Sequence, residues 1–173
     1  MNRFTRISLF GVGLVAGIAV LPASAQVYNN TATATFTVNL IIQSDCTIAA
    51  NPLSFGTSGV LDTNVDAETT VSVTCSNTTP YNIGLNEGNV TGSTVANRLL
   101  AGTTGGNTGT TVAYQLYQDA ARATVWGNTQ PTDTLSGVGT GTAQTIPVYG
   151  RVPPQTTPTA DTYQSTVTAT VFF

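Results

Sequence analysis

The most regular pattern of the chain lies in residues 31–46, where apolar and polar positions alternate. The apolar positions of this stretch are Ala32, Ala34, Phe36, Val38, Leu40 and Ile42. Successive side chains of a β-strand point to opposite faces, so the alternation predicts a strand with one apolar and one mostly polar face. Two interpretations remain open: the strand is the first of the domain's own sheet, or it is donated to another molecule. Its length ahead of the first cysteine is unusual for a domain's own first strand.

The same alternation recurs in short stretches along the rest of the chain. The predicted strands cover residues 46–50, 53–55, 69–75, 81–85, 96–100, 112–116, 123–126, 144–152 and 163–173. Pro147 interrupts one of them, which predicts an edge strand or a bulge, because proline has no N–H to donate to a ladder. Abundant threonine and 17 glycines favour strands joined by tight turns. The pattern predicts an all-β sandwich of Greek-key type.

Residues 1–25 have the three parts of a secretory signal peptide. Arg3 and Arg6 supply a positive start, residues 7–21 are mostly apolar, and Ala23 and Ala25 form an A-x-A cleavage pattern. A membrane anchor is the alternative, but the apolar run is short for a bilayer span. No later stretch is as long and apolar, so we expect an exported chain without a membrane span. The predicted organisation is a signal peptide over residues 1–25, a donor-strand segment over 26–45 and a β-sandwich domain over 46–173.

The chain after residue 25 carries few charges. Arg98, Arg122 and Arg151 are its only basic residues against eight acids, which leaves a net charge of −5. An acidic surface with so few charges argues against nucleic acid and against anionic membranes as partners.

Cys46 and Cys75 are the only cysteines of the sequence. In an exported chain a disulfide is the default for such a pair. A metal site is the rival interpretation, but two isolated cysteines without histidine cannot complete a tetrahedral site.

The sequence offers no catalytic or cofactor site. The chain has no histidine and no lysine, which removes the common nucleophilic triads, Schiff bases and phosphate-binding lysine loops. Asp62, Asp66 and Glu68 lie close together in sequence, but their spacing fits no calcium loop. We interpret them as part of a solvated polar loop. The expectation is a protein that is not an enzyme and that holds no metal and no cofactor.

Several segments together resemble the spore coat protein U domain family. Near the start, the alternating strand is followed by Cys-Thr-Ile at 46–48, by PLSFG at 52–56 and by the second cysteine in Val-Thr-Cys at 73–75. Later segments of the resemblance are VANRLL at 95–100, YQLYQDAARATVWG at 114–127, GTAQTIPVYGRVP at 141–153 and TYQSTVTATVFF at 162–173. Members of this family include subunits of archaic, Csu-type chaperone–usher pili.

The resemblance implies an immunoglobulin-like sandwich that lacks one strand. In such pilins a periplasmic chaperone lends a strand first, and at an outer-membrane usher the N-terminal strand of the next subunit replaces it. The donor function then falls on Ala32–Ile42 and the disulfide on Cys46 and Cys75. We also expect the C-terminal strand to border the open groove. The residues expected at this edge are Val167, Ala169, Val171 and Phe173.

The implied function is a structural subunit of a surface fibre that contributes to adhesion and biofilm formation. The implied partners are a periplasmic pilus chaperone, an outer-membrane usher and neighbouring pilin subunits, and the implied location is the periplasm in transit and then a fimbrium of a Gram-negative bacterium. Tip adhesins of such pili have an extra domain before the pilin domain, so the expected rank is shaft or adaptor subunit. The alternative is a self-complete secreted β-sandwich that coats a surface or binds a ligand.

Overall fold

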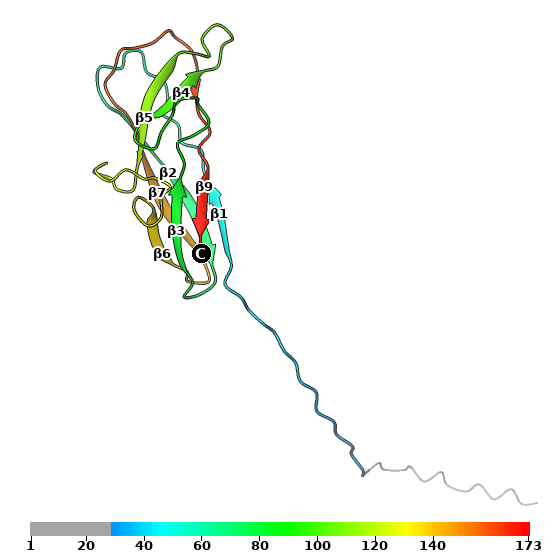
Figure 1. Cartoon of the computed structure of the whole chain (residues 1–173). Coiled ribbons are helices and arrows are strands. Elements are labelled where there is room, and N and C mark those ends of the chain that lie inside the picture. The colour runs from blue at the N-terminus through cyan, green and yellow to red at the C-terminus, as the bar shows by residue number, and fades with distance from the viewer. Residues whose placement is uncertain (1–28) are drawn as a thin grey trace, which may run out of the picture. The chain divides into compact units, whose positions relative to one another are not determined.

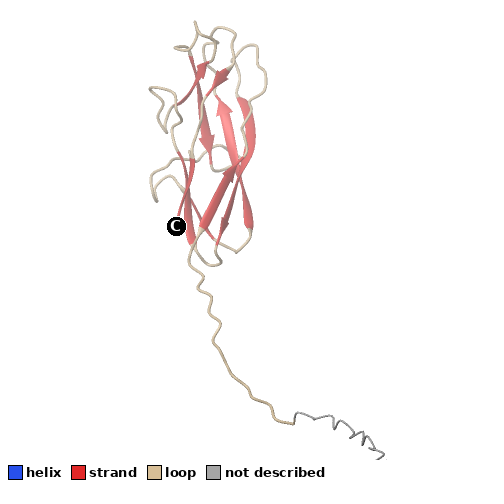
Figure 2. Cartoon of the chain, turned by 90° about the vertical axis from the view of Figure 1, so that its right-hand side faces the viewer, coloured by secondary structure: helices blue, strands red, loops and turns tan. Residues whose placement is uncertain are grey.

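The computed structural model describes residues 29–173, and every regular element in this range is a β-strand (Figure 2). The signal peptide predicted over residues 1–25 lies outside the described residues. The strands of the described part are β1 (Cys46–Ala50), β2 (Val65–Cys75), β3 (Pro80–Leu85), β4 (Arg98–Gly102), β5 (Thr111–Tyr117), β6 (Leu135–Val138), β7 (Ala143–Val152), β8 (Tyr163–Gln164) and β9 (Ala169–Phe172).

The strands form two antiparallel sheets (Figure 1). One sheet has the strand order β1-β2-β7-β5-β4-β8, and the other has the order β6-β3-β9. The longest ladder joins β2 to β7, from Val65 opposite Val152 to Thr74 opposite Ala143. Neighbouring strands are often distant in sequence, as in a chain that crosses between two packed layers. The predicted all-β sandwich is therefore confirmed.

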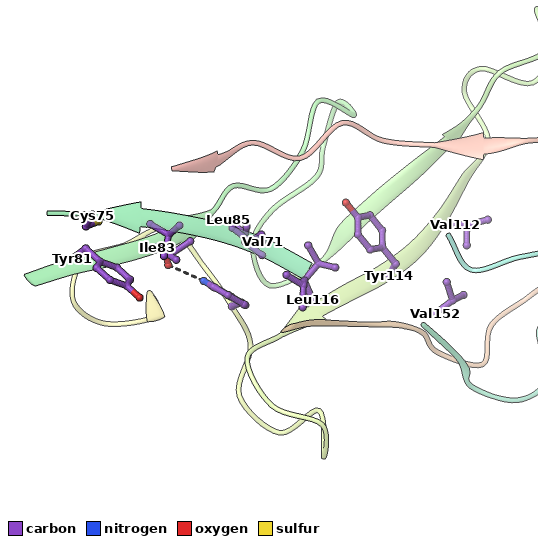
Figure 3. Packing of buried hydrophobic residues seen from close by; sticks show 12 residues of the cluster. Val71, Cys75, Tyr81, Ile83, Leu85, Val112, Tyr114, Leu116 and Val152 are labelled. Carbon is purple, nitrogen blue, oxygen red and sulfur yellow. Dashed lines mark hydrogen bonds between the residues drawn. The ribbon is translucent and has the colours of Figure 1, made fainter. Parts of the chain in front are cut away.

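The core lies between the inner faces of the two sheets. It contains apolar side chains that alternate along each strand, as the sequence pattern predicts. The buried members are Val71, Val73, Cys75, Tyr81, Ile83, Leu85, Val112, Tyr114, Leu116, Trp126, Val148 and Val152. Trp126 is completely buried, and its indole Nε1–H donates a hydrogen bond to the Ile83 carbonyl at 2.8 Å (Figure 3). This bond satisfies the polar atom of the largest core side chain.

Cys46 and Cys75 form a disulfide, as the sequence predicts. They lie directly opposite each other at the start of β1 and the end of β2. The bond therefore joins the edge strand β1 covalently to the longest strand of the sheet.

The position of Pro147 differs from the prediction. Its strand, β7, lies between β2 and β5, so β7 as a whole is not an edge strand. However, the pairing with β5 begins only at Tyr149, opposite Tyr117. At Pro147 the strand is paired on one side alone, with Thr70 of β2. The site is locally an edge, which is where a sheet tolerates proline.

Other boundaries differ because tertiary pairing decides them. Strand β2 begins at Val65, inside a stretch expected to be loop, and β6 forms within a Gly-rich stretch. The stretch 123–126 makes only one isolated bridge, between Tyr117 and Val125. The stretch 163–173 is divided between the two sheets, because β8 pairs with β4 and β9 pairs with β3. No strand forms over 53–55.

Candidate functional site

The domain has an open groove of about 1070 Å³. Residues 50–59 line one wall, and residues 157–167 together with Ala169 line the other. The floor consists of apolar core side chains, several of which Figure 3 shows side by side. These floor residues are Val71, Leu85, Val112, Tyr114, Leu116, Val148 and Val152.

Most of the 50–59 wall has no ladder, because β1 ends at Ala50. The last backbone bond to β2 runs from the Asn51 N–H to the Thr70 carbonyl at 3.0 Å. Pro52 follows and has no N–H to donate. Beyond it, Leu53 and Phe55 are half-buried and point toward the core, where a Cβ at Gly150 would lie 2.6 Å from the Leu53 Cδ2. Glycine at this position of β7 leaves the space that the wall needs.

The opposite wall has a free backbone edge between β8 and β9. In the stretch 165–168 the Thr168 carbonyl accepts a hydrogen bond from Asn86 N–H on the β3 side. Alternate residues of an extended strand point their backbone groups to opposite sides, so those of Ser165 and Val167 face the groove. Within the described residues no hydrogen bond uses these backbone groups. An edge of this kind is a template for another strand.

The groove is almost free of charge. Asp161 is the only acidic or basic residue that lines it. Its carboxylate accepts hydrogen bonds from the Asn107 amide at 2.9 Å and the Thr104 hydroxyl at 2.7 Å, and these bonds hold the pKa of Asp161 well below its usual range. Burial raises the pKa of Tyr114 on the floor, against the opposing effect of its hydrogen bond with Ser165, so this phenol stays neutral. The site can therefore bind an uncharged, extended, alternately apolar segment.

The N-terminal segment, residues 29–45, contains no strand. All six predicted donor residues, Ala32, Ala34, Phe36, Val38, Leu40 and Ile42, are exposed. The exposed fraction reaches 87 % for Phe36 and 83 % for Leu40, and no charged residue occurs between 29 and 44. Residues 29–44 therefore have an uncharged, alternately apolar pattern and no strand of their own.

The predicted groove-edge residues lie in two environments. Val167 and Ala169 line the groove. Val171 is half-buried against the core in β9, and Phe173 lies beyond β9 with 59 % of its surface exposed. The sequence analysis did not identify Leu53, Phe55 and Tyr114 as groove residues. Their alternation was visible in the sequence, but nothing local shows that the wall beside them lacks a partner.

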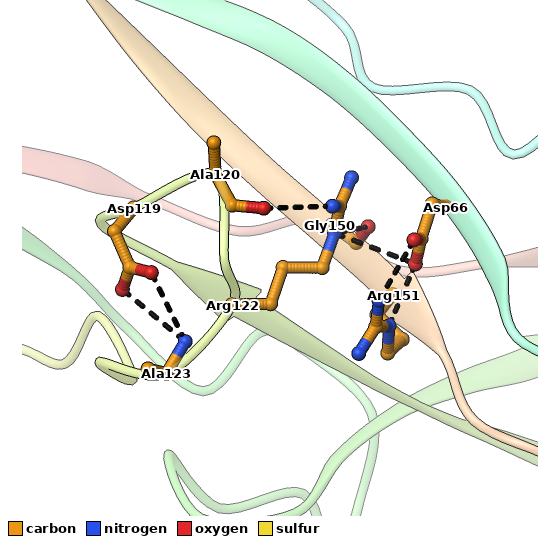
Figure 4. Close-up of polar contacts among 7 residues, drawn as sticks. All are labelled: Asp66, Asp119, Ala120, Arg122, Ala123, Gly150 and Arg151. Carbon is orange, nitrogen blue, oxygen red and sulfur yellow. Dashed lines mark hydrogen bonds and ion pairs between the residues drawn. The ribbon is translucent and has the colours of Figure 1, made fainter.

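The predicted polar loop around Asp66 is organised differently. Asp66 lies in β2, where it accepts bonds of 2.7 and 2.8 Å from Arg151, and Arg122 lies 3.4 Å away (Figure 4). The hydrogen bond from Arg151 is the main reason that the pKa of Asp66 is lowered. In residues 29–173 no cluster of three His, Cys, Asp or Glu side chains is placed to hold a metal ion. No helix in this same range is long and apolar enough to cross a bilayer.

Comparisons with known proteins agree with this architecture. No curated protein matches the chain. A similar solved structure is a chain in the crystal structure of the CsuC–CsuE chaperone–tip adhesion subunit pre-assembly complex from archaic chaperone–usher Csu pili of Acinetobacter baumannii. The two share 24% identity with a TM-score of 0.53 over 76% of this chain and 40% of that chain, a likeness that shows a shared fold. The family model described as Spore Coat Protein U domain matches residues 32–170, and this chain belongs to that family.

Proposed function

We propose that this chain is a structural subunit of a surface fibre built by the chaperone–usher route. One observation supports this most strongly: a single chain has both an open apolar groove with a free backbone edge and an exposed, uncharged segment with alternating apolar residues. The groove has an apolar floor and free backbone groups but no strand beside them. The segment has the alternating apolar residues of a strand but no sheet beside it. The groove of one copy then receives the N-terminal segment of the next, and repetition of this contact builds the fibre.

The apolar face of the N-terminal segment supplies much of the binding free energy. Burial of one large apolar side chain contributes roughly 1.5–3 kcal/mol. Phe36, Val38, Leu40 and Ile42 together supply on the order of 10 kcal/mol, an upper value because unfolded chains are already partly compact. Association and ordering consume several kcal/mol of this. A tight contact therefore also requires backbone hydrogen bonds, for which Ser165 and Val167 offer free groups.

We expect one direction for the incoming segment in the groove. The groove lining ends at Ala50 on one wall and Ala169 on the other, where β1 and β9 lie close together. We expect small side chains of the segment at this end, beside the two close strands, and larger ones toward Tyr163. We expect Ala32 and Ala34 near Ala169, which makes the segment antiparallel to the stretch 163–169.

An unoccupied groove also explains why the subunit needs help before assembly. Its apolar floor and free edge promote aggregation unless another strand covers them. We infer that a periplasmic chaperone covers the groove first and that an outer-membrane usher exchanges this cover for the next subunit. The mature fibre then lies on the cell surface of a Gram-negative bacterium and contributes to adhesion and biofilm formation.

The test removes the segment and then returns it in another place. Deletion of residues 31–39 should abolish polymers that resist SDS in the cold. Fusion of the same residues behind Phe173 through a flexible linker should give a stable monomer that fills its own groove. As a control, replacement of Thr33, Thr35 and Thr37 by serine changes only the polar face and should leave the polymers unchanged.

Polymers that persist after the deletion would refute the proposal. A deletion variant that is a stable monomer without the fused copy would favour the alternative, a self-complete secreted β-sandwich of the spore-coat kind.

A further inference from the structure

Side chains, rather than a neighbouring strand, hold the backbone extended at the free edge formed by Ser165 and Val167. Strand β3 ends at Leu85 and β9 begins at Ala169, so the stretch 165–168 has no ladder on either side. A stretch without a ladder would normally be free to change its conformation. Here its backbone is hydrogen-bonded on the side away from the groove.

Two asparagine side chains make these bonds. The Asn86 Oδ1 accepts a hydrogen bond from Thr168 N–H at 2.8 Å. The Asn89 Oδ1 accepts one from Thr166 N–H, also at 2.8 Å, and one from the Ser165 hydroxyl at 3.4 Å. The two amide oxygens therefore take the place of the carbonyls that a continued β3 would offer.

The loop that bears these asparagines is itself fixed. Arg98 is completely buried, and its Nε donates to the Asn86 carbonyl at 2.9 Å. Gly88 has a φ of +91°, and a Cβ there would lie 2.4 Å from the Ser165 Oγ. Only glycine allows the loop to approach the wall this closely. Arg98, Asn86 and Gly88 thus place the Asn89 oxygen at a fixed distance from the wall.

We propose that Asn86 and Asn89 are positioning residues that keep residues 165–168 extended while the groove is empty, with the backbone groups of Ser165 and Val167 ready for an incoming strand. This inference rests on the proposed function. An ordered edge binds faster than one that must first become extended, because only the competent fraction of molecules can accept the strand. After binding, the incoming strand itself holds the stretch extended, so loss of the asparagine affects the empty state most.

The experiment compares Asn89→Ala, Asn89→Asp and a control, Asn77→Ala, in the full chain with its disulfide intact. Asn77 is exposed in the β2–β3 loop and lies outside the groove. The chain is unfolded in guanidinium chloride and diluted to nanomolar concentration into an excess of a fluorescent peptide of residues 31–44. Association is followed directly, and dissociation is followed after a chase with unlabelled peptide.

Asn89→Ala should lower the association rate about two- to tenfold, the factor that corresponds to loss of one ordinary hydrogen bond, here the shorter one from Thr166 N–H. The dissociation rate should stay unchanged. Asn89→Asp should restore the wild-type rate, because Asn89 uses only its Oδ1 as an acceptor here and a carboxylate supplies the same oxygen. Asn77→Ala should behave as wild type.

Three results would overturn the inference. The first is an association rate of Asn89→Ala equal to that of the wild type, and the second is a dissociation rate of Asn89→Ala that rises by the expected two- to tenfold. The third is an association rate of Asn89→Asp that stays below that of the wild type. In each of these the wild type still captures the peptide, so the proposed function stands. If the wild type captures no peptide, the proposed function fails and the inference fails with it.

Discussion

The buried Arg98 gives the sharpest prediction about stability. Its side chain is completely buried, and within the described residues it makes no ion pair with a carboxylate. Instead its guanidinium donates to the carbonyls of Leu85 at 2.8 Å, Trp126 at 2.7 Å and Asn86 at 2.9 Å. Burial lowers the pKa of Arg98, but an arginine remains a cation at any pH at which the protein folds.

Replacement of Arg98 by methionine keeps much of the volume and removes every donor. The carbonyls of Leu85, Asn86 and Trp126 then lose this donor, as do the Val95 carbonyl and the side-chain oxygen of Gln115. An unsatisfied buried acceptor costs about 1–3 kcal/mol. Three such acceptors together cost at least about 3 kcal/mol, so we expect a loss of about 4 kcal/mol. That is a large share of the roughly 5–15 kcal/mol by which a domain is stable.

The assay is equilibrium unfolding of the disulfide-intact full chain in guanidinium chloride. With a slope of about 4 kcal/mol per molar denaturant, the midpoint should fall by about 1 M. Arg151→Met is the matched control, because Arg151 makes an ion pair at the surface, and such pairs contribute little. Equal shifts in the two variants would refute the argument that burial and unsatisfied carbonyls determine the cost.

Three further predictions test the groove and its supports. Phe36→Ala in the 31–44 peptide should weaken its affinity for the groove about ten- to a hundredfold, and Thr35→Ala on the polar face should leave the affinity unchanged. Equal losses of affinity would contradict the assigned faces. Because the pKa of Asp161 is lowered from 3.8 in the folded chain, its stabilising effect is present above about pH 4 and is lost as the pH falls further. In thermal unfolding between about pH 2 and 6, the melting temperature of Asp161→Asn should therefore fall less steeply with acid than that of the wild type, and equal slopes would contradict this role. Reduction of the Cys46–Cys75 bond should cost about 3–4 kcal/mol in denaturant unfolding, and an unchanged midpoint would show that the bond constrains little.

The local pattern of the sequence determined most strands. In β2, β3 and β5 the alternation of apolar residues predicted both the strand and its buried face, since the side-chain period of a strand is a local property. The disulfide followed equally from the presence of two cysteines in a chain predicted to be exported. The position of Pro147 was harder to predict, because an edge depends on where the neighbouring strand β5 ends.

Only the tertiary structure decided which segments lack a partner. The stretches 31–42 and 53–55 have the same alternating pattern as β5, yet they form no strand in this chain. Pairing depends on whether another segment is within hydrogen-bonding distance, and no local pattern contains that information. For the same reason the sequence did not reveal that Arg98 is buried, nor that Asn86 and Asn89 hold the wall of the groove.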